Sequence, residues 1–100
     1  MPTYDRTDTF RADYAALSPD ERKAFRDVVT KFVQDLENLP HGTFRRSLRV
    51  KPMQGAPGIF EMTWEGSNGR ATFMYGEEIT KGEPHIIWRR VGGHAIFGDP

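Results

Sequence analysis

The sequence predicts an α+β fold in which an N-terminal helical hairpin packs on one face of an antiparallel sheet of at least four strands. Two observations carry this prediction. Hydrophobic residues recur at helical spacing through residues 1–40, and from Phe44 onward they alternate with polar residues at a period of two. The first pattern is typical of amphipathic helices and the second of strands buried on one face. Because the helices precede the strands, we expect two segregated layers.

The chain of 100 residues has the size of one domain, and we expect a single domain over residues 1–100. It has no cysteine, which excludes disulfides and thiolate metal sites within it. No apolar run approaches the ~20 residues of a membrane span, and residues 1–6 lack the pattern of a signal peptide. We therefore expect a cytoplasmic protein without a membrane partner.

The formal net charge is zero, but the charge is unevenly distributed. Residues 1–40 contain six basic and eight acidic side chains, and residues 61–100 contain four basic and six acidic ones. Residues 41–60 contain four basic side chains and no acidic one: Arg45, Arg46, Arg49 and Lys51. This block can attract phosphate within a Debye length of ~8–10 Å. Overall neutrality, in contrast, is unlike a typical nucleic-acid-binding protein.

The first helix is predicted by Phe10, Tyr14 and Leu17, which are spaced at i, i+4 and i+7 and therefore share one helical face. Thr7 or Asp8 can serve as its N-cap. Either side chain offers an oxygen atom to the backbone N–H groups of the first turn, which have no partner within the helix.

The second helix has the clearest start signal in the chain. Ser18 at the N-cap and Glu21 three residues later form a capping box, with Pro19 at the first helical position. Pro19 also ends the preceding helix, because the residue before a proline avoids the α region. The apolar stripe then covers three turns and comprises Phe25, Val28, Val29, Phe32, Val33 and Leu36. Residues 39–42 contain a proline and a glycine that end the helix.

Four strands are expected in the second half of the chain. The expected segments are residues 44–51, 59–64, 70–75 and 86–91, separated by clusters of glycine, proline and polar residues. Residues 3–6 are compatible with one further short strand. The shared apolar side of the two helices is expected to cover the apolar face of this sheet.

The alternation also predicts how the two middle strands pair. If their apolar residues share one face, Phe60 lies opposite Tyr75 and Glu65 opposite Arg70, with residues 66–69 as the turn. A slip by one residue would move the aromatic side chains into water. The other face of the sheet is then polar and carries Arg49, Lys51, Glu61, Thr63, Arg70 and Thr72.

The final strand ends in a Gly-Gly pair directly before His94. Two glycines permit positive φ or a sharp kink, and imidazole titrates near neutral pH. With Arg89 and Arg90 upstream and Phe97 downstream, this segment suits proton transfer, charge neutralisation and base stacking on a phosphodiester. The structural alternative is a capped strand end whose His94 binds a carbonyl, with Phe97 as a core or lid residue.

Cleavage of RNA by its own 2′-hydroxyl needs a base, an acid for the 5′ leaving oxygen and cations for the phosphorane charge. His94 can act as acid or base, Arg70 can bind phosphate bidentately, and Glu61 is the second acid/base candidate. Two of these residues also have structural alternatives. Arg70 can pair with Glu65 across the strands, and Glu61 can pair with Lys51.

No metal or small-molecule cofactor is expected. His41 and His85 have no neighbouring ligand at metal spacing. The sequence also contains no Walker, dinucleotide-binding or nucleophile-elbow motif.

Three segments resemble the RelE/ParE superfamily of toxins from bacterial type II toxin–antitoxin modules. They are residues 51–55 (Lys-Pro-Met-Gln-Gly), 69–75 and 92–97, and the similarity extends over nearly the whole chain. The resemblance implies a compact α+β fold with a helical hairpin on an antiparallel sheet. It also implies a toxin that cleaves mRNA, usually in the ribosomal A site, unless a cognate antitoxin covers its active face.

The resemblance assigns acid/base catalysis to His94 and phosphate stabilisation to Arg70, and it matches Phe97 to an aromatic residue of the family's tail. We therefore expect an endoribonuclease that acts on mRNA at the ribosome, with His94, Arg70 and Glu61 as its catalytic residues. We expect the RNA to be held by Arg49, Lys51, Arg89, Arg90 and Phe97.

Two departures from the family leave alternatives open. The chain is neutral, whereas many RNA-cutting members are strongly basic. Glu61 and Thr63 also stand where some members have lysines or a second histidine. One alternative is a ParE-like toxin that inhibits DNA gyrase by protein contact and has no nuclease activity. Another is a catalytically weak member that only binds an antitoxin.

Overall fold

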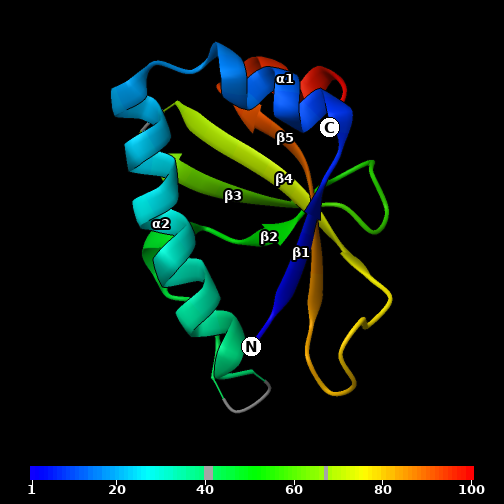
Figure 1. Ribbon diagram of the computed structural model, residues 1–100. Coiled ribbons are helices and arrows are strands. Elements are labelled where there is room, and N and C mark those ends of the chain that lie inside the picture. Colours follow the sequence, from blue (N-terminus) through cyan, green and yellow to red (C-terminus); the bar gives the residue numbers. More distant parts are fainter. Residues whose placement is uncertain (40–41, 67) are drawn as a thin grey trace.

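The computed structural model describes residues 1–39, 42–66 and 68–100. Its helices are α1 (Asp8–Ala16) and α2 (Pro19–Glu37), with short 3-10 helices η1 (Arg46–Leu48) and η2 (His94–Gly98). Its strands are β1 (Thr3–Arg6), β2 (Lys51–Pro52), β3 (Phe60–Glu65), β4 (Gly69–Gly76) and β5 (His85–Gly92). They form one sheet in the order β1-β5-β4-β3-β2 (Figure 1).

The predicted fold class is confirmed, since two N-terminal helices pack on a five-stranded, mostly antiparallel sheet (Figure 1). β1, at one edge, runs parallel to β5, and the other neighbouring strands are antiparallel. Among the described residues, no helix combines the length and the apolar content needed to cross a bilayer.

Both helices begin at the predicted caps. The Thr7 side chain accepts the Phe10 N–H at 3.1 Å, and its hydroxyl donates to the Arg89 carbonyl of β5 at 2.9 Å. Ser18 and Glu21 form the reciprocal capping box of α2. α2 ends at Glu37, whereas residues 40 and 41 of the predicted stop lie outside the described residues.

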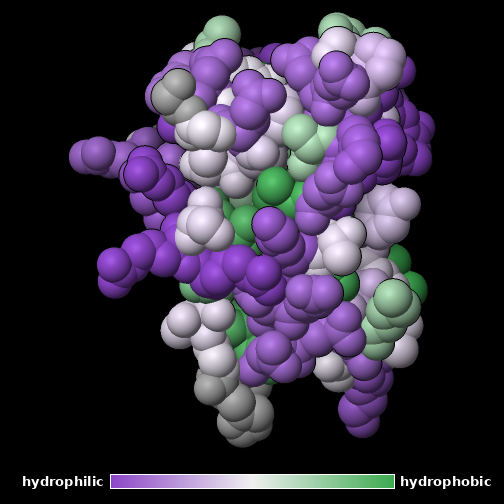
Figure 2. All heavy atoms as spheres, turned by 90° about the vertical axis from the view of Figure 1, so that its left-hand side faces the viewer, coloured by the Kyte–Doolittle hydropathy of each residue, from purple (hydrophilic) through white to green (hydrophobic). Residues whose placement is uncertain are grey.

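The hydrophobic core lies between the helices and one face of the sheet. α2 packs on β3, and α1 packs on β5. The ring of Phe32 is 5.0 Å from that of Phe73 and 5.3 Å from that of Trp88, between ring centroids. Phe25 contacts Trp88 and Trp64 edge to face. The surface seen from the side of α2 is mostly hydrophilic, with apolar atoms visible mainly in a central hollow (Figure 2).

The predicted register between β3 and β4 is wrong by two residues. Phe60 lies opposite Phe73, and Thr63 rather than Glu65 lies opposite Arg70. A bulge between Thr63 and Glu65 then displaces the pairing, so Glu65 faces Gly69. A two-residue shift keeps the same side chains on the same face, so the alternation alone does not distinguish the two registers.

The predicted strand over residues 44–51 is also wrong, because this segment forms η1 and contributes only its last residue, Lys51, to the two-residue β2. Asp35 of α2 explains the difference. Its carboxylate accepts the Arg45 backbone N–H at 2.9 Å and two bonds from the Arg45 guanidinium at 2.8 and 2.9 Å. Arg45 is therefore tied to the helix layer, and the chain reaches the sheet edge only after Arg49, whose φ is 50°.

Candidate active site on the open face of the sheet

The face of the sheet opposite the helices, which we call the open face, carries polar side chains in register. Lys51, Glu61, Thr72 and Arg90 form one row across β2, β3, β4 and β5. Thr63 of β3 and Arg70 of β4 belong to the next row, which ends at Gly92 on β5. The sheet therefore brings predicted site residues from four strands to one face.

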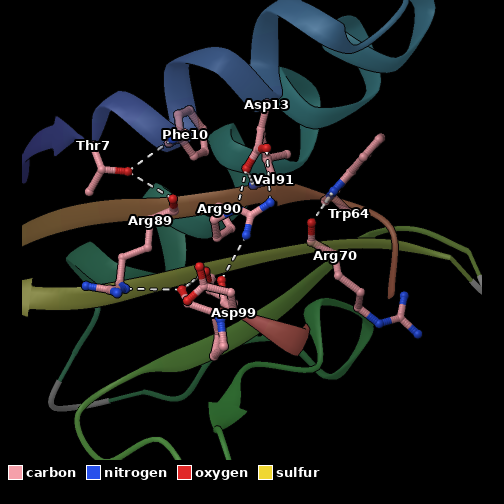
Figure 3. Close-up of polar contacts among 11 residues, drawn as sticks. Thr7, Phe10, Asp13, Trp64, Arg70, Arg89, Arg90, Val91 and Asp99 are labelled. Carbon is pink, nitrogen blue, oxygen red and sulfur yellow. Dashed lines mark hydrogen bonds and ion pairs between the residues drawn. The ribbon is translucent and has the colours of Figure 1, made fainter. Parts of the chain in front are cut away.

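Arg70 lies at the start of β4 and is only 8% exposed. Its Nη1 donates to the Gly69 carbonyl at 2.9 Å, and its own carbonyl accepts the Trp64 indole N–H at 2.8 Å. The indole bond holds the backbone of Arg70 at the β3 bulge. Figure 3 shows the Arg70 side chain extending away from Arg89, Arg90 and Asp99. Arg70 thus has a fixed position, with a small accessible surface at one end of the sheet.

His94 is the first residue of η2 and is exposed. Its ring packs edge to face against Phe97, with 5.7 Å between the ring centroids. Its backbone N–H donates to Asn68 Oδ1 at 3.4 Å. Because Asn68 precedes Arg70 by two residues and Arg70 lies opposite Gly92, His94 and Arg70 are at the same end of the sheet. The imidazole is therefore accessible from solvent at this end of the sheet.

The Gly-Gly pair is needed because its residues have no side chains, and not because of an unusual backbone conformation. The φ of Gly93 is −103°, which other residues can adopt. A Cβ atom at Gly93 would lie 2.9 Å from the Asn68 side chain, and one at Gly92 would lie 3.1 Å from Ile96. Glycine therefore lets the strand end approach the β3–β4 turn, and this approach positions His94.

A bulge in β5 places both arginines of the final strand on the open face. Phe73 pairs with Trp88, but Thr72 pairs with Arg90, so one extra residue, Arg89, is inserted. Both guanidinium groups then contact residues 98–100. Strict alternation would turn only one of two consecutive strand residues to this face, and the bulge turns both toward it.

Arg90 is held by an acidic residue of α1. Its Nε and Nη2 donate to the two carboxylate oxygens of Asp13 at 2.7 and 3.2 Å, and Asp13 also accepts the Val91 N–H (Figure 3). Hydrogen bonding to Asp13 raises the pKa of the Arg90 guanidinium above its ordinary value. A bidentate pair with both side chains about one-fifth exposed is mainly structural, and this reduces the role predicted for Arg90 in binding RNA.

Residues 98–100 lie against the same face. The main-chain oxygen of Pro100 accepts from Thr72 Oγ1 at 3.0 Å and from Arg89 Nε at 3.1 Å. The carbonyl of Asp99 accepts from Arg90 Nη1 at 2.9 Å (Figure 3). The open face is therefore covered at its centre, and Thr72 is fully buried.

Glu61 and Lys51 lie opposite each other, as the structural alternative predicted. Their Nζ and Oε1 atoms are 3.8 Å apart, with the Lys51 side chain 66% exposed. Such a pair contributes little to stability, on the order of 0–1 kcal/mol. Glu61 therefore has a cationic neighbour, but it also faces the same side of the sheet as Thr72, one row from Arg70.

The two remaining predicted RNA contacts lie on different elements of the fold. Arg49 is exposed between η1 and β2, in a left-handed conformation that is uncommon for a residue other than glycine. Phe97 is half-buried in η2 beside His94. The structure thus groups Phe97 with the candidate acid/base residue and places Arg49 near the β2 edge.

Sequence reasoning missed Asp13, Thr72 as a bonded group, and residues 98–100. Asp13 stands between the apolar positions of α1 and looks like any solvated helix residue, so no pattern marks it. Among the described residues, no group of three or more His, Cys, Asp or Glu side chains is placed to hold a metal ion.

Comparison with known proteins identifies the fold. No protein-family model and no curated protein matches the chain. Among solved structures, the chain is similar to the RelB–RelE antitoxin–toxin complex from Methanococcus jannaschii, with a TM-score of 0.61, 17% identity and 95% of each chain covered. It is also similar to the isolated E. coli RelE toxin (TM-score 0.55, 18% identity, 91% of this chain and 82% of RelE). A YoeB/ParE toxin from Agrobacterium tumefaciens matches with a TM-score of 0.57 and 14% identity over 92% of this chain and 98% of that chain. The chain therefore has the α+β fold of the RelE, YoeB and ParE toxins.

Proposed function

We propose that this protein is the toxin of a type II toxin–antitoxin module and cleaves mRNA at the ribosome. The observation that carries the proposal is the placement of an exposed imidazole, His94, at the same end of a RelE-like sheet as Arg70. The fold supports the toxin class, and the pair of side chains supports the nuclease chemistry.

In the proposed reaction the nucleophile is a hydroxyl group of the RNA itself. The 2′-hydroxyl loses its proton and attacks the adjacent phosphorus, and the bond to the 5′ oxygen breaks as that oxygen takes up a proton. The products are a 2′,3′-cyclic phosphate and a 5′-hydroxyl. His94 supplies one of the two proton transfers, and Glu61 is the candidate for the other. Arg70 stabilises the extra negative charge on the phosphorane.

The remaining candidates position the RNA. Phe97, which packs against His94, would stack on a base next to the cleaved bond, a contact worth ~1–3 kcal/mol. Lys51 and Arg49 lie on the β2 side and would attract the backbone of mRNA or ribosomal RNA. Arg89 and Arg90 would extend this contact along β5.

A cognate antitoxin is the proposed protein partner, since RelE structures have been determined with RelB bound. A groove between α2 and β1 suits such a partner. It has a volume of about 290 Å³ and is lined mainly by apolar side chains, including Tyr4, Phe25, Val29, Val33, Ile86 and Trp88. Its two charged lining residues are Arg6 and Arg26. We infer that the antitoxin places an amphipathic segment with acidic residues along its edge in this groove.

The second candidate function is inhibition by protein contact, as in a ParE-like gyrase inhibitor, or antitoxin binding alone. The observation that favours it is the state of the charged residues. Arg90 is paired with Asp13, Glu61 lies beside Lys51, and Arg70 is mostly buried. Of the three predicted catalytic residues, His94 is the one with an exposed side chain.

Primer extension on mRNA after induction of the toxin separates the two functions. The wild-type chain should produce new 5′ ends within coding regions, and His94→Ala should reduce them by about 10²–10⁴-fold, the usual contribution of a general acid or base. Lys31→Ala, on the exposed side of α2, is the matched control and should cut normally. Growth arrest by the wild type without any new 5′ ends would instead support the contact inhibitor.

A further inference from the structure

Residues 98–100 occupy hydrogen-bond donors that a phosphate group would use. The Thr72 hydroxyl and Arg89 Nε converge on one oxygen, the main-chain oxygen of Pro100, from two neighbouring strands. A non-bridging phosphate oxygen could accept the same two hydrogen bonds, one from the hydroxyl and one from the guanidinium. Hydrogen bonds from a guanidinium to such an anionic oxygen are roughly twice as strong as neutral ones.

Arg89 differs from Arg90 in what surrounds its charge. Arg90 already binds the Asp13 carboxylate with two nitrogen atoms. Among the described residues, the Arg89 side chain donates to the main-chain oxygen of Pro100 and to Met74 Sδ at 3.8 Å, and neither bond goes to an Asp or Glu side chain. A cavity of about 90 Å³ adjoins both arginines and residues 99–100. Arg89 is therefore a half-buried cation beside open space, which favours an anionic ligand.

We propose that Thr72 and Arg89 form a second phosphate site for the RNA backbone, and that residues 98–100 close it in this structure. The inference rests on the proposed function, because it adds a backbone contact on the same face of the sheet. Arg89 precedes His94 by five residues along the chain, a distance of at most about 17 Å. The phosphate bound there is thus a neighbour of the cleaved one, and the site positions RNA rather than reacting with it.

Displacement of residues 99 and 100 breaks three hydrogen bonds to the open face and the bond from the Asp99 N–H to the Ile96 carbonyl. Gly98 and Asp99 are exposed, and the hydrogen bonds to the open face come from Thr72, Arg89 and Arg90. RNA and this segment therefore compete for the same donors. While the segment occupies these donors, the affinity of the protein for RNA is lower.

The test measures binding separately from cleavage. It compares the chain with a version that lacks residues 99 and 100, both carrying His94→Ala, using a short fluorescent single-stranded RNA with 2′-O-methyl groups that block cleavage. Without the segment, anisotropy should show tighter binding. The slope of the logarithm of the binding constant against the logarithm of salt concentration should steepen by about 0.7, which corresponds to one more phosphate contact.

Two further variants identify the site. In the shortened chain, Arg89→Ala should remove the gain in affinity and slope, whereas Lys31→Ala on the exposed side of α2 should keep it. An unchanged affinity and slope after removal of residues 99 and 100 would overturn the proposal. A gain that persists in the Arg89→Ala chain would also overturn it.

Inorganic phosphate provides a measurement that depends neither on RNA nor on the shortened chain. In the intact chain, titration with phosphate followed by nitrogen-15 NMR should shift the Nε–H of Arg89 and the backbone N–H of Asp99 together. If phosphate shifts both while the RNA probe binds no version of the chain, the anion site stands and the RNA function fails. If neither resonance moves with phosphate, the anion site is wrong.

Discussion

The two faces of the sheet are stabilised in different ways. The helix-covered face is an aromatic layer. Trp88 contacts Phe25, Phe32 and Phe73, and Phe32 also contacts Phe73. On the open face, polar side chains are held by directional contacts with specific partners, such as Arg90 with Asp13 and Thr72 with Pro100, often from a distant part of the chain. Apolar contacts are non-directional, whereas hydrogen bonds and ion pairs require defined geometry. The covered face should therefore control stability, and the open face should control the arrangement of the site.

The largest expected effect comes from opening the covered face. Phe32 is 1% exposed, so Phe32→Ala should destabilise the protein by about 3–5 kcal/mol, through lost burial and the cavity that remains. Urea denaturation measures the change in unfolding free energy. Val29→Ala, at a half-buried position of the same helix, is the control and should have a clearly smaller effect. Equal losses at both positions would mean that the aromatic layer is not the main source of stability.

A smaller effect is expected from the ion pair that connects α1 with β5. Asp13→Ala removes two charged hydrogen bonds to Arg90 and one to the Val91 N–H, and should destabilise by about 2 kcal/mol. A double-mutant cycle with Arg90→Ala measures the coupling. Two additive effects would show that the pair does not join the helix to the open face.

The contact between Asp35 and Arg45 should make stability depend on pH. Hydrogen bonding to Arg45 lowers the pKa of the Asp35 carboxyl below its usual value of 3.8. Because the folded-state pKa is the lower one, the stabilisation is fully present above the unfolded value and is lost as the pH falls through the folded value. The unfolding free energies of wild type and Asp35→Asn, measured by denaturation between pH 7 and pH 2 and plotted against pH, should converge in acid. Parallel curves over this range would contradict the prediction.

The smallest stability effect is expected at Lys51. Its pair with Glu61 is exposed, and Lys51→Ala should change the unfolding free energy by less than about 0.5 kcal/mol. This makes Lys51 a useful probe of the open face, because any loss of RNA affinity in the variant reports a contact rather than unfolding. A decrease of more than about 1 kcal/mol in the unfolding free energy of Lys51→Ala would show that the open face also contributes to stability.

The sequence predicted the parts of the fold that depend on near neighbours. Thr7 and Ser18 cap the helices because each acts on the three residues that follow it. The same reasoning failed for residues 44–51, where a contact with Asp35, ten residues before Arg45, prevents a long strand. It also gave a β3–β4 register that is wrong by two residues.

For the candidate site, the sequence indicated the residue types but not their partners. His94, Arg70 and Arg89 were identified as candidates, and the glycine pair before His94 was recognised. The reason for the glycines, close approach to Asn68, needed the β3–β4 turn in place. The bond between Arg90 and Asp13 joins residues 77 positions apart, and no local pattern indicates it.

By itself, the sequence determined the two helices, the presence of a one-sided sheet and the polar character of its second face, because periodicity and capping depend on nearby residues. Only the tertiary structure decided the register, the bulge that turns Arg89 and Arg90 to one side, and the position of residues 98–100 over Thr72. Alternation repeats every two residues, so it is unchanged by a two-residue shift. Contacts between distant segments choose among the arrangements that it allows.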